Sequence, residues 1–135
     1  MNTTAPLPEF MLLFRNTQLE QRLSSGDMTE AMQRLNEWLE RWTVSGHLKG
    51  GQPLSYDGKT ISGAKQRTIA DGPFEESKEA VGGYVLIQAS DFEEALKIAG
   101  EWPLLDYEAA VEVRPVRHQC PSMEAVGMQL YPIEA

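Results

Sequence analysis

The chain has 135 residues and a mass of 15.1 kDa, which is the size of one compact domain. Its formal net charge is -8, with 12 Lys and Arg against 20 Asp and Glu, so its surface repels phosphate backbones and nucleic acid is not an expected partner. The longest apolar runs, such as residues 10–14 and 84–87, are far shorter than the roughly 20 residues of a membrane-spanning helix. With no secretory signal at the start and a single Cys120, we expect a cytoplasmic protein without a membrane partner.

The first two elements follow a Pro-containing lead. Residues 9–15 form a short apolar run, which predicts a buried strand. From Met28 to Trp42 the apolar residues then recur at spacings of three and four, which predicts a helix over about residues 28–45. Asp27 with Glu30 resembles a capping box at its start, and Gly46 stands where a left-handed C-terminal cap would lie.

The middle of the chain is richer in turns. Residues 47–54 and 66–70 predict two strands joined by a hairpin-like connection, and a Gly-Pro turn follows Asp71. Residues 82–89 predict a central strand, after which Ser90 and Glu93 would cap a second helix that ends near Gly100. Residues 110–116 alternate apolar and charged side chains, as a half-buried strand does. The tail predicts one more strand-like piece near residues 128–132.

The order of these elements gives two similar strand-helix-strand halves. This order predicts an α+β domain with a ferredoxin-like sheet and both helices on one face. The other face would then leave a large apolar surface in water. The simplest cover is the same face of a second copy, so we expect a homodimer.

Residues 71–84, with the sequence DGPFEESKEAVGGY, resemble the signature of the DGPF branch of the YCII-related proteins. Residues 10–13, Gly50-Gly51 and residues 111–116 add to the resemblance. It implies a domain over residues 9–117, between a lead (1–8) and a C-terminal extension (118–135), whose dimer forms an α/β barrel with a cleft near the signature loop. Residues 102–110 depart from the pattern, because family members often carry a Gly-containing turn there and sometimes a His.

Asp71 is the candidate catalytic residue. A carboxylate beside a Gly-Pro turn is able to act as a general base if it is buried, and the alternative is that it caps the backbone of the turn. Arg15 ends the first strand, where it would bind a carboxylate of a ligand or pair with Glu112.

The other candidate ligand-binding residues lie in or at the end of the signature. Phe74, Lys78, Glu79 and Tyr84 would line the mouth of the cleft. For Lys78 and Glu79 the alternative is that they pair charges on a solvated loop.

No metal and no cofactor are expected. His47, His118 and Cys120 are too few and too scattered to form a zinc site, and Gly82-Gly83 precede a strand rather than the helix of a phosphate-binding loop. Trp38 falls on the apolar stripe of the first helix, which favours core or dimer packing.

Two functions remain open at this point. The first is a cytoplasmic homodimer whose cleft near the signature loop binds a small polar or aromatic molecule, with or without cofactor-free chemistry. The second is a non-enzymatic regulatory or interaction module, because relatives of the DGPF branch have been linked to extracytoplasmic-function sigma factors. The sequence leaves open whether the protein is an enzyme.

Overall fold

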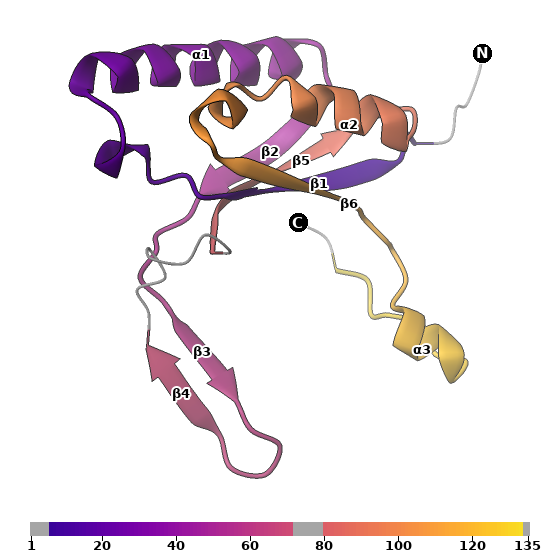
Figure 1. Cartoon of the computed structure of the whole chain (residues 1–135). Helices are drawn as coiled ribbons and strands as arrows, with labels where there is room; N and C mark the ends of the chain where they lie inside the picture. The colour runs from indigo at the N-terminus through magenta and orange to yellow at the C-terminus, as the bar shows by residue number, and fades with distance from the viewer. Residues whose placement is uncertain (1–5, 72–79, 134–135) are drawn as a thin grey trace, which may run out of the picture.

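The computed structural model describes residues 6–71 and 80–133 and has the predicted α+β class. Four antiparallel strands form one sheet in the order β2 (Leu48–Pro53), β5 (Val81–Gln88), β1 (Glu9–Arg15) and β6 (Ala110–Pro115). Two helices, α1 (Ser25–Val44) and α2 (Phe92–Gly100), cover one face of this sheet (Figure 1). In the described part of the chain the sheet does not close into a barrel.

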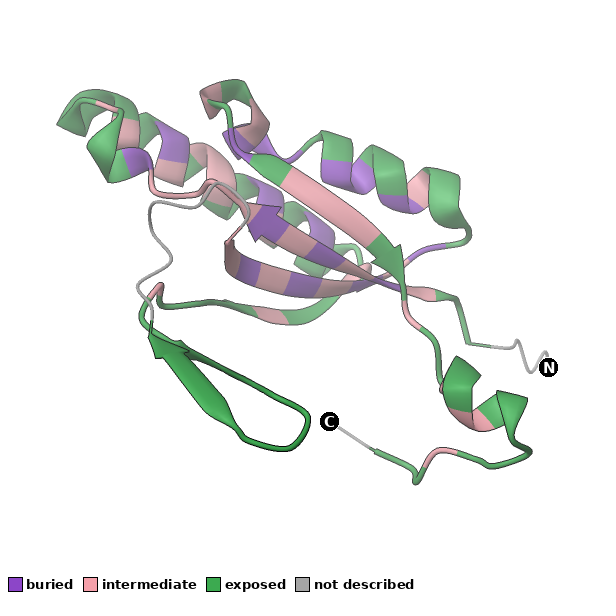
Figure 2. Cartoon of the chain, turned by 60° about the horizontal axis from the view of Figure 1, so that its bottom comes forward, coloured by how far each residue is buried: buried purple, intermediate pink, exposed green. Residues whose placement is uncertain are grey.

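The central strand β1 shows why the sheet has one buried face. Its residues alternate in burial, with Phe10, Leu12 and Phe14 packed under the helices and the residues between them only half-buried (Figure 2). Successive side chains of a strand point to opposite faces, so this alternation separates a core face from an open face. Leu12 pairs with Val85 of β5, which alternates in the same way.

Helix α1 begins earlier than predicted, at Ser25, because Ser24 is the N-cap. The Ser24 side chain accepts a hydrogen bond from the backbone N–H of Asp27 at 3.2 Å, so Asp27 is a first-turn residue rather than the cap. The predicted left-handed residue after the helix is confirmed, since Gly46 has a φ of +88°.

The N-cap of helix α2 also differs by one residue from the prediction. Asp91, not Ser90, is the N-cap, and its carboxylate accepts from the backbone N–H of Glu94 at 2.8 Å. Glu94 in turn accepts from the backbone N–H of Ser90 at 2.8 Å. The first of these bonds satisfies an N–H group that the first turn of a helix cannot satisfy itself, and the second joins the residue before the N-cap to the same turn. A 3-10 helix, Pro103–Tyr107, then leads to β6.

The predicted strand pair at residues 47–54 and 66–70 is wrong in its pairing. β2 joins the main sheet beside β5, whereas β4 (Thr68–Asp71) pairs with β3 (Lys59–Ser62) in a separate hairpin. Every residue of β3 and β4 is exposed, because strands rich in Thr, Ser and charged residues have little apolar surface to bury. The hairpin projects away from the sheet on the side opposite the helices (Figure 1).

The C-terminal extension contains a short helix rather than the expected strand. α3 (Pro121–Ala125) begins at a proline, whose fixed backbone angle suits the first helical position. Residues 128–133 form no strand, so the prediction for this segment is wrong. Within residues 6–71 and 80–133, no helix has the length and apolar character needed to cross a membrane.

The cap of α2 predicts a pH effect. The pKa of Glu94 lies below its ordinary value of 4.5, mainly because its carboxylate accepts the Ser90 N–H bond and also because His47 lies nearby. A carboxyl group with a lowered pKa stabilises the fold above its ordinary pKa, and this stabilisation is lost as the pH falls through the lowered value. Thermal unfolding of Glu94→Gln should therefore occur at a lower temperature than that of the wild type at pH 7, and the difference should shrink as the pH falls below the ordinary pKa of 4.5.

The matched control is Glu93→Gln, which removes the same charge from an exposed neighbour in the same helical turn. A difference between Glu94→Gln and the wild type that persists unchanged at pH 3 would contradict the assignment.

Candidate functional site

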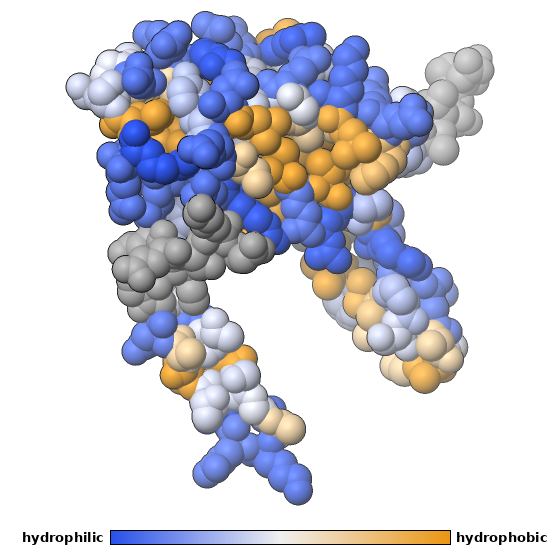
Figure 3. Space-filling view, viewed as in Figure 1, coloured by the Kyte–Doolittle hydropathy of each residue, from blue (hydrophilic) through white to orange (hydrophobic). Residues whose placement is uncertain are grey.

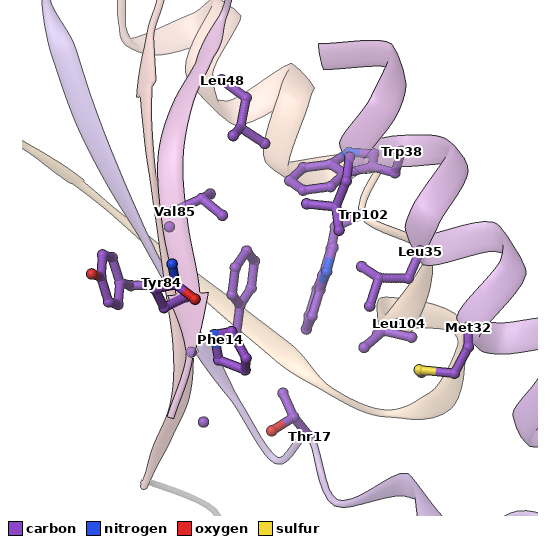
Figure 4. Close-up of a pocket in the computed structure, with 16 residues that line it drawn as sticks. Phe14, Thr17, Met32, Leu35, Trp38, Leu48, Tyr84, Val85, Trp102 and Leu104 are labelled. Atoms are coloured by element: carbon purple, nitrogen blue, oxygen red, sulfur yellow. The ribbon is translucent and has the colours of Figure 1, made fainter. Parts of the chain in front are cut away.

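A cavity of about 370 Å³ lies between α1 and the core face of β5 and β2 (Figure 4). Its walls are mostly apolar. They include Leu35 from α1, Val85 from β5, Leu104 from the 3-10 helix and three aromatic residues described below. The cavity therefore lies on the helix-covered side of the sheet, where β1, β2, β5, α1 and the 3-10 helix meet.

The aromatic residues Phe14, Trp38 and Trp102 connect these elements. The rings of Phe14 and Trp102 stack with their centroids 4.4 Å apart, and Trp38 meets Phe14 edge-on at 6.3 Å. The indole N–H of Trp38 donates to the carbonyl of Ile98 in α2 at 3.1 Å, so the polar atom of this buried residue is satisfied. The three large rings thus link β1, α1 and the segment after α2, and all three face the cavity.

Glycines border the strand side of the cavity. A Cβ atom added at Gly51 would lie 2.7 Å from both the Cα and the Cγ1 of Val85, and one added at Gly83 would lie 3.8 Å from the Phe14 ring. Both glycines line the cavity. Gly51 and Gly83 therefore allow close packing between β2 and β5 beside the cavity.

A polar edge of the cavity, called its mouth below, lies at Thr17. Thr17 lines it, and its hydroxyl is hydrogen-bonded to the hydroxyl of Tyr56, which follows β2. Thr17 is placed there by Asn16, which has a φ of +56°, a conformation that Asn tolerates better than most residues. Arg22 fixes this turn by donating to the Asn16 carbonyl and to the Tyr107 carbonyl, both at 2.8 Å.

The candidate catalytic residue Asp71 lies elsewhere. It ends β4 on the hairpin, its side chain is 69% exposed, and it is ion-paired with Lys59. It does not line the cavity, and it lacks the burial on which a general-base role depends. Three candidate ligand-binding residues, Phe74, Lys78 and Glu79, lie outside the described residues.

The two remaining candidate ligand-binding residues, Arg15 and Tyr84, do not point into the cavity. Arg15 is ion-paired with Glu112 of β6, the structural alternative that the sequence suggested, and it belongs to the β1 residues that alternate away from the helices. Tyr84 borders the cavity through its position in β5, but its ring points away from the cavity (Figure 4). The signature segment still reaches the cavity, because Gly82 and Gly83 line it.

The histidines and the cysteine are dispersed. His47 Nδ1 lies 2.7 Å from the Ser45 hydroxyl and its Nε2 lies 3.7 Å from Glu94, while His118 lies beside Glu9 at 3.7 Å. The residues that the structure describes contain no group of three or more His, Cys, Asp or Glu that could hold a metal ion.

Sequence reasoning missed most of the cavity. Trp38 was assigned to packing, which is correct, but the helical stripe gives no sign that its ring also borders an open space. Thr17 and Tyr56 are 39 residues apart and belong to no motif, so nothing in the sequence brings them together. Gly82 and Gly83 were the available signal, since a glycine pair before a strand suggests close backbone packing or a bulge.

A comparison with known protein families matches the part of the chain that forms the main sheet and its two helices. A family model described as the YCII-related domain matches residues 9–120, a range that includes the sheet, α1, α2 and every residue that lines the cavity. A search of curated proteins finds no match.

The close packing of β2 on β5 predicts different effects for adjacent glycines. In Gly51→Ala the new methyl group would collide with the backbone of β5, so we expect the free energy of unfolding to fall by about 1–3 kcal/mol in denaturant titrations. Gly50→Ala is the matched control, because a Cβ atom there meets nothing within 4 Å. Equal effects of the two substitutions would contradict the described packing.

Proposed function

The chain belongs to the YCII-related family, and we propose that it binds a small, largely apolar aromatic molecule in the cavity between α1 and the sheet. The observation that carries this proposal is the combination of aromatic walls with a polar mouth at a single cavity. Ligand pockets of proteins are typically apolar concavities with a few polar groups that fix the orientation of the ligand.

The size and the chemistry of the cavity support binding rather than catalysis. Its volume of about 370 Å³ falls in the range of roughly 300–1,000 Å³ that is usual for small-molecule sites. Among the described residues, its lining contains no Asp, Glu, His, Lys, Arg or Cys, the groups that most often act as acids, bases or nucleophiles. Of the two kinds of ligand expected from the sequence, polar or aromatic, the cavity therefore favours an aromatic one.

The proposal is tested by filling the cavity. Leu35→Trp would place a large ring among the wall residues, so we expect isothermal titration calorimetry to show at least about a tenfold loss of affinity for 4-propylphenol, used as a neutral aromatic probe. Gln33→Trp is the control, because Gln33 is exposed on the same helix. Unchanged probe binding to a folded Leu35→Trp variant would contradict the proposal.

A second function, as an interaction module, has one observation in its favour. Ile61 and Ile69 lie directly opposite each other on the exposed hairpin, and their residues are 66% and 62% exposed. Figure 3 shows this apolar spot on an otherwise polar projection. Adjacent exposed isoleucines favour a protein contact. An association with a sigma factor stays a prediction, as does a cytoplasmic location.

The ferredoxin-like topology is supported by the strand order. Leaving the hairpin aside, the sheet strands in chain order are β1, β2, β5 and β6, with α1 after the first and α2 after the third. In the sheet the third strand lies between the first and the second, and the fourth lies on the outer side of the first. This βαββαβ sequence with all neighbours antiparallel supports the ferredoxin-like assignment.

The proposed homodimer would use the open face of this sheet. Met11 and Leu13 of β1 pair with Leu86 and Tyr84 of β5, so four half-buried, largely apolar side chains form a stripe on the face away from the helices. Such a stripe on the face that no helix covers favours pairing with the same face of a second copy.

The charges next to the stripe also support self-association. Glu112 and Arg114 of β6 pair with Leu13 and Met11 in the sheet, and Arg15 is ion-paired with Glu112. Acidic and basic side chains therefore alternate beside the stripe, although the whole chain has a net charge of -8. Two such faces would meet without the repulsion that two strongly acidic surfaces would feel.

We expect Leu13→Glu to convert the dimer to a monomer, because it places a carboxylate in the centre of the stripe on both copies. The measurement is the molar mass from sedimentation equilibrium at micromolar concentration. Leu96→Glu is the control, since Leu96 is 46% exposed on α2, on the helix side. A monomeric wild type, or a dimeric Leu13→Glu variant, would rule out this interface.

A further inference from the structure

The hydroxyl groups of Thr17 and Tyr56 form a polar pair at the cavity mouth. They are hydrogen-bonded to each other, and either oxygen is able to be the donor. Gly82 lies against both, because a Cβ atom added at Gly82 would collide with the Thr17 and the Tyr56 hydroxyl oxygens. The missing side chain at position 82 therefore provides the space in which the two hydroxyls meet.

The backbone around this pair is fixed from both sides. On one side, Arg22 holds the turn at Asn16 that precedes Thr17. On the other, the backbone N–H of Leu54 donates to the carbonyl of Gly82 at 2.9 Å, which holds the segment after β2, and with it Tyr56, beside the start of β5. The two hydroxyls thus have defined positions relative to a wall residue, Gly82, although they come from distant parts of the chain.

We propose that the Thr17–Tyr56 hydroxyl pair is the polar recognition point of the cavity, and that it selects neutral ligands with an aromatic body and one hydroxyl or carbonyl group. This inference rests on the proposed binding function and adds the class of ligand. A hydroxyl pair both donates and accepts, so a ligand hydroxyl inserted beside it completes a hydrogen-bonded chain. The aromatic body then contacts Phe14, Trp38 and Trp102.

Charge on the ligand works against binding at this point. The described residues that line the cavity include no Lys or Arg, and Arg15 is ion-paired with Glu112. A carboxylate that entered the apolar cavity would lose its hydration without gaining a cationic partner. Neutral phenols and aromatic alcohols or ketones therefore fit the cavity better than aromatic acids.

The test compares three probes of nearly the same shape at pH 7. 4-Propylphenol both donates and accepts, 4-propylanisole only accepts, and 4-propylbenzoate is an anion. By isothermal titration calorimetry we expect the phenol to bind at least about tenfold more tightly than the benzoate. Thr17→Val and Tyr56→Phe should each weaken the phenol by about two- to tenfold, the usual worth of one neutral hydrogen bond, and leave the anisole less affected.

Gly82→Ala provides an independent variant, because its methyl group would displace both hydroxyls while leaving them in the chain. It should reduce the preference for the phenol over the anisole. Gly100→Ala is its control, since a Cβ atom there meets nothing within 4 Å. If Gly82→Ala does not fold, the two hydroxyl variants carry the test, since neither adds an atom at the crowded position.

The outcomes separate this inference from the proposed function. Absence of binding by all three probes would overturn both. Binding that is weakened by Leu35→Trp but equally strong for phenol and benzoate, or equally affected by Thr17→Val for phenol and anisole, would overturn the recognition point alone.

Discussion

The stacked rings of Phe14 and Trp102 are the contact on which the arrangement of this protein depends. Phe14 belongs to the central strand and Trp102 to the segment after α2, and their centroids lie 4.4 Å apart. Trp38 meets the same Phe14 from α1 and is hydrogen-bonded to α2 through the Ile98 carbonyl. Aromatic contacts of this kind combine large buried area with a preferred geometry. Three rigid rings fill part of the space between sheet and helix, and the part they leave open is the cavity.

The sequence predicted the parts of the fold that repeat at short range. Helices α1 and α2 and strand β6 follow from spacing, because a buried stripe or an alternating face imposes a period that neighbouring residues share, and β1 follows from a short apolar run. The helix N-caps were predicted less exactly. Ser24, Asp27, Ser90 and Asp91 are all suitable N-cap residues, and only the three-dimensional path of the chain decides which backbone N–H each side chain reaches.

Pairing between distant segments was harder to predict. The turn-rich residues between 47–54 and 66–70 predicted a hairpin-like connection, yet the hydrogen-bonding partner of β2 is β5, which also borders the cavity. The candidate site was hard to predict for the same reason, because it also depended on which strands pair. Asp71 was chosen for its place beside the Gly-Pro turn, but its strand pairs with β3 on an exposed hairpin. Thr17 and Tyr56 meet only because the sheet and the turn at Asn16 bring them together.

All three tryptophans of the chain, Trp38, Trp42 and Trp102, are buried on the helix side of the sheet, at 3–8% exposure. Two of them line the cavity, and none belongs to the strands that form the open face. The tryptophan fluorescence of the folded protein therefore originates from one side of the molecule. An aromatic guest in the cavity would lie in contact with two of the emitting rings, whereas a second subunit on the open face would leave their surroundings unchanged. The protein thus carries a built-in optical probe that distinguishes its two proposed contacts without any label.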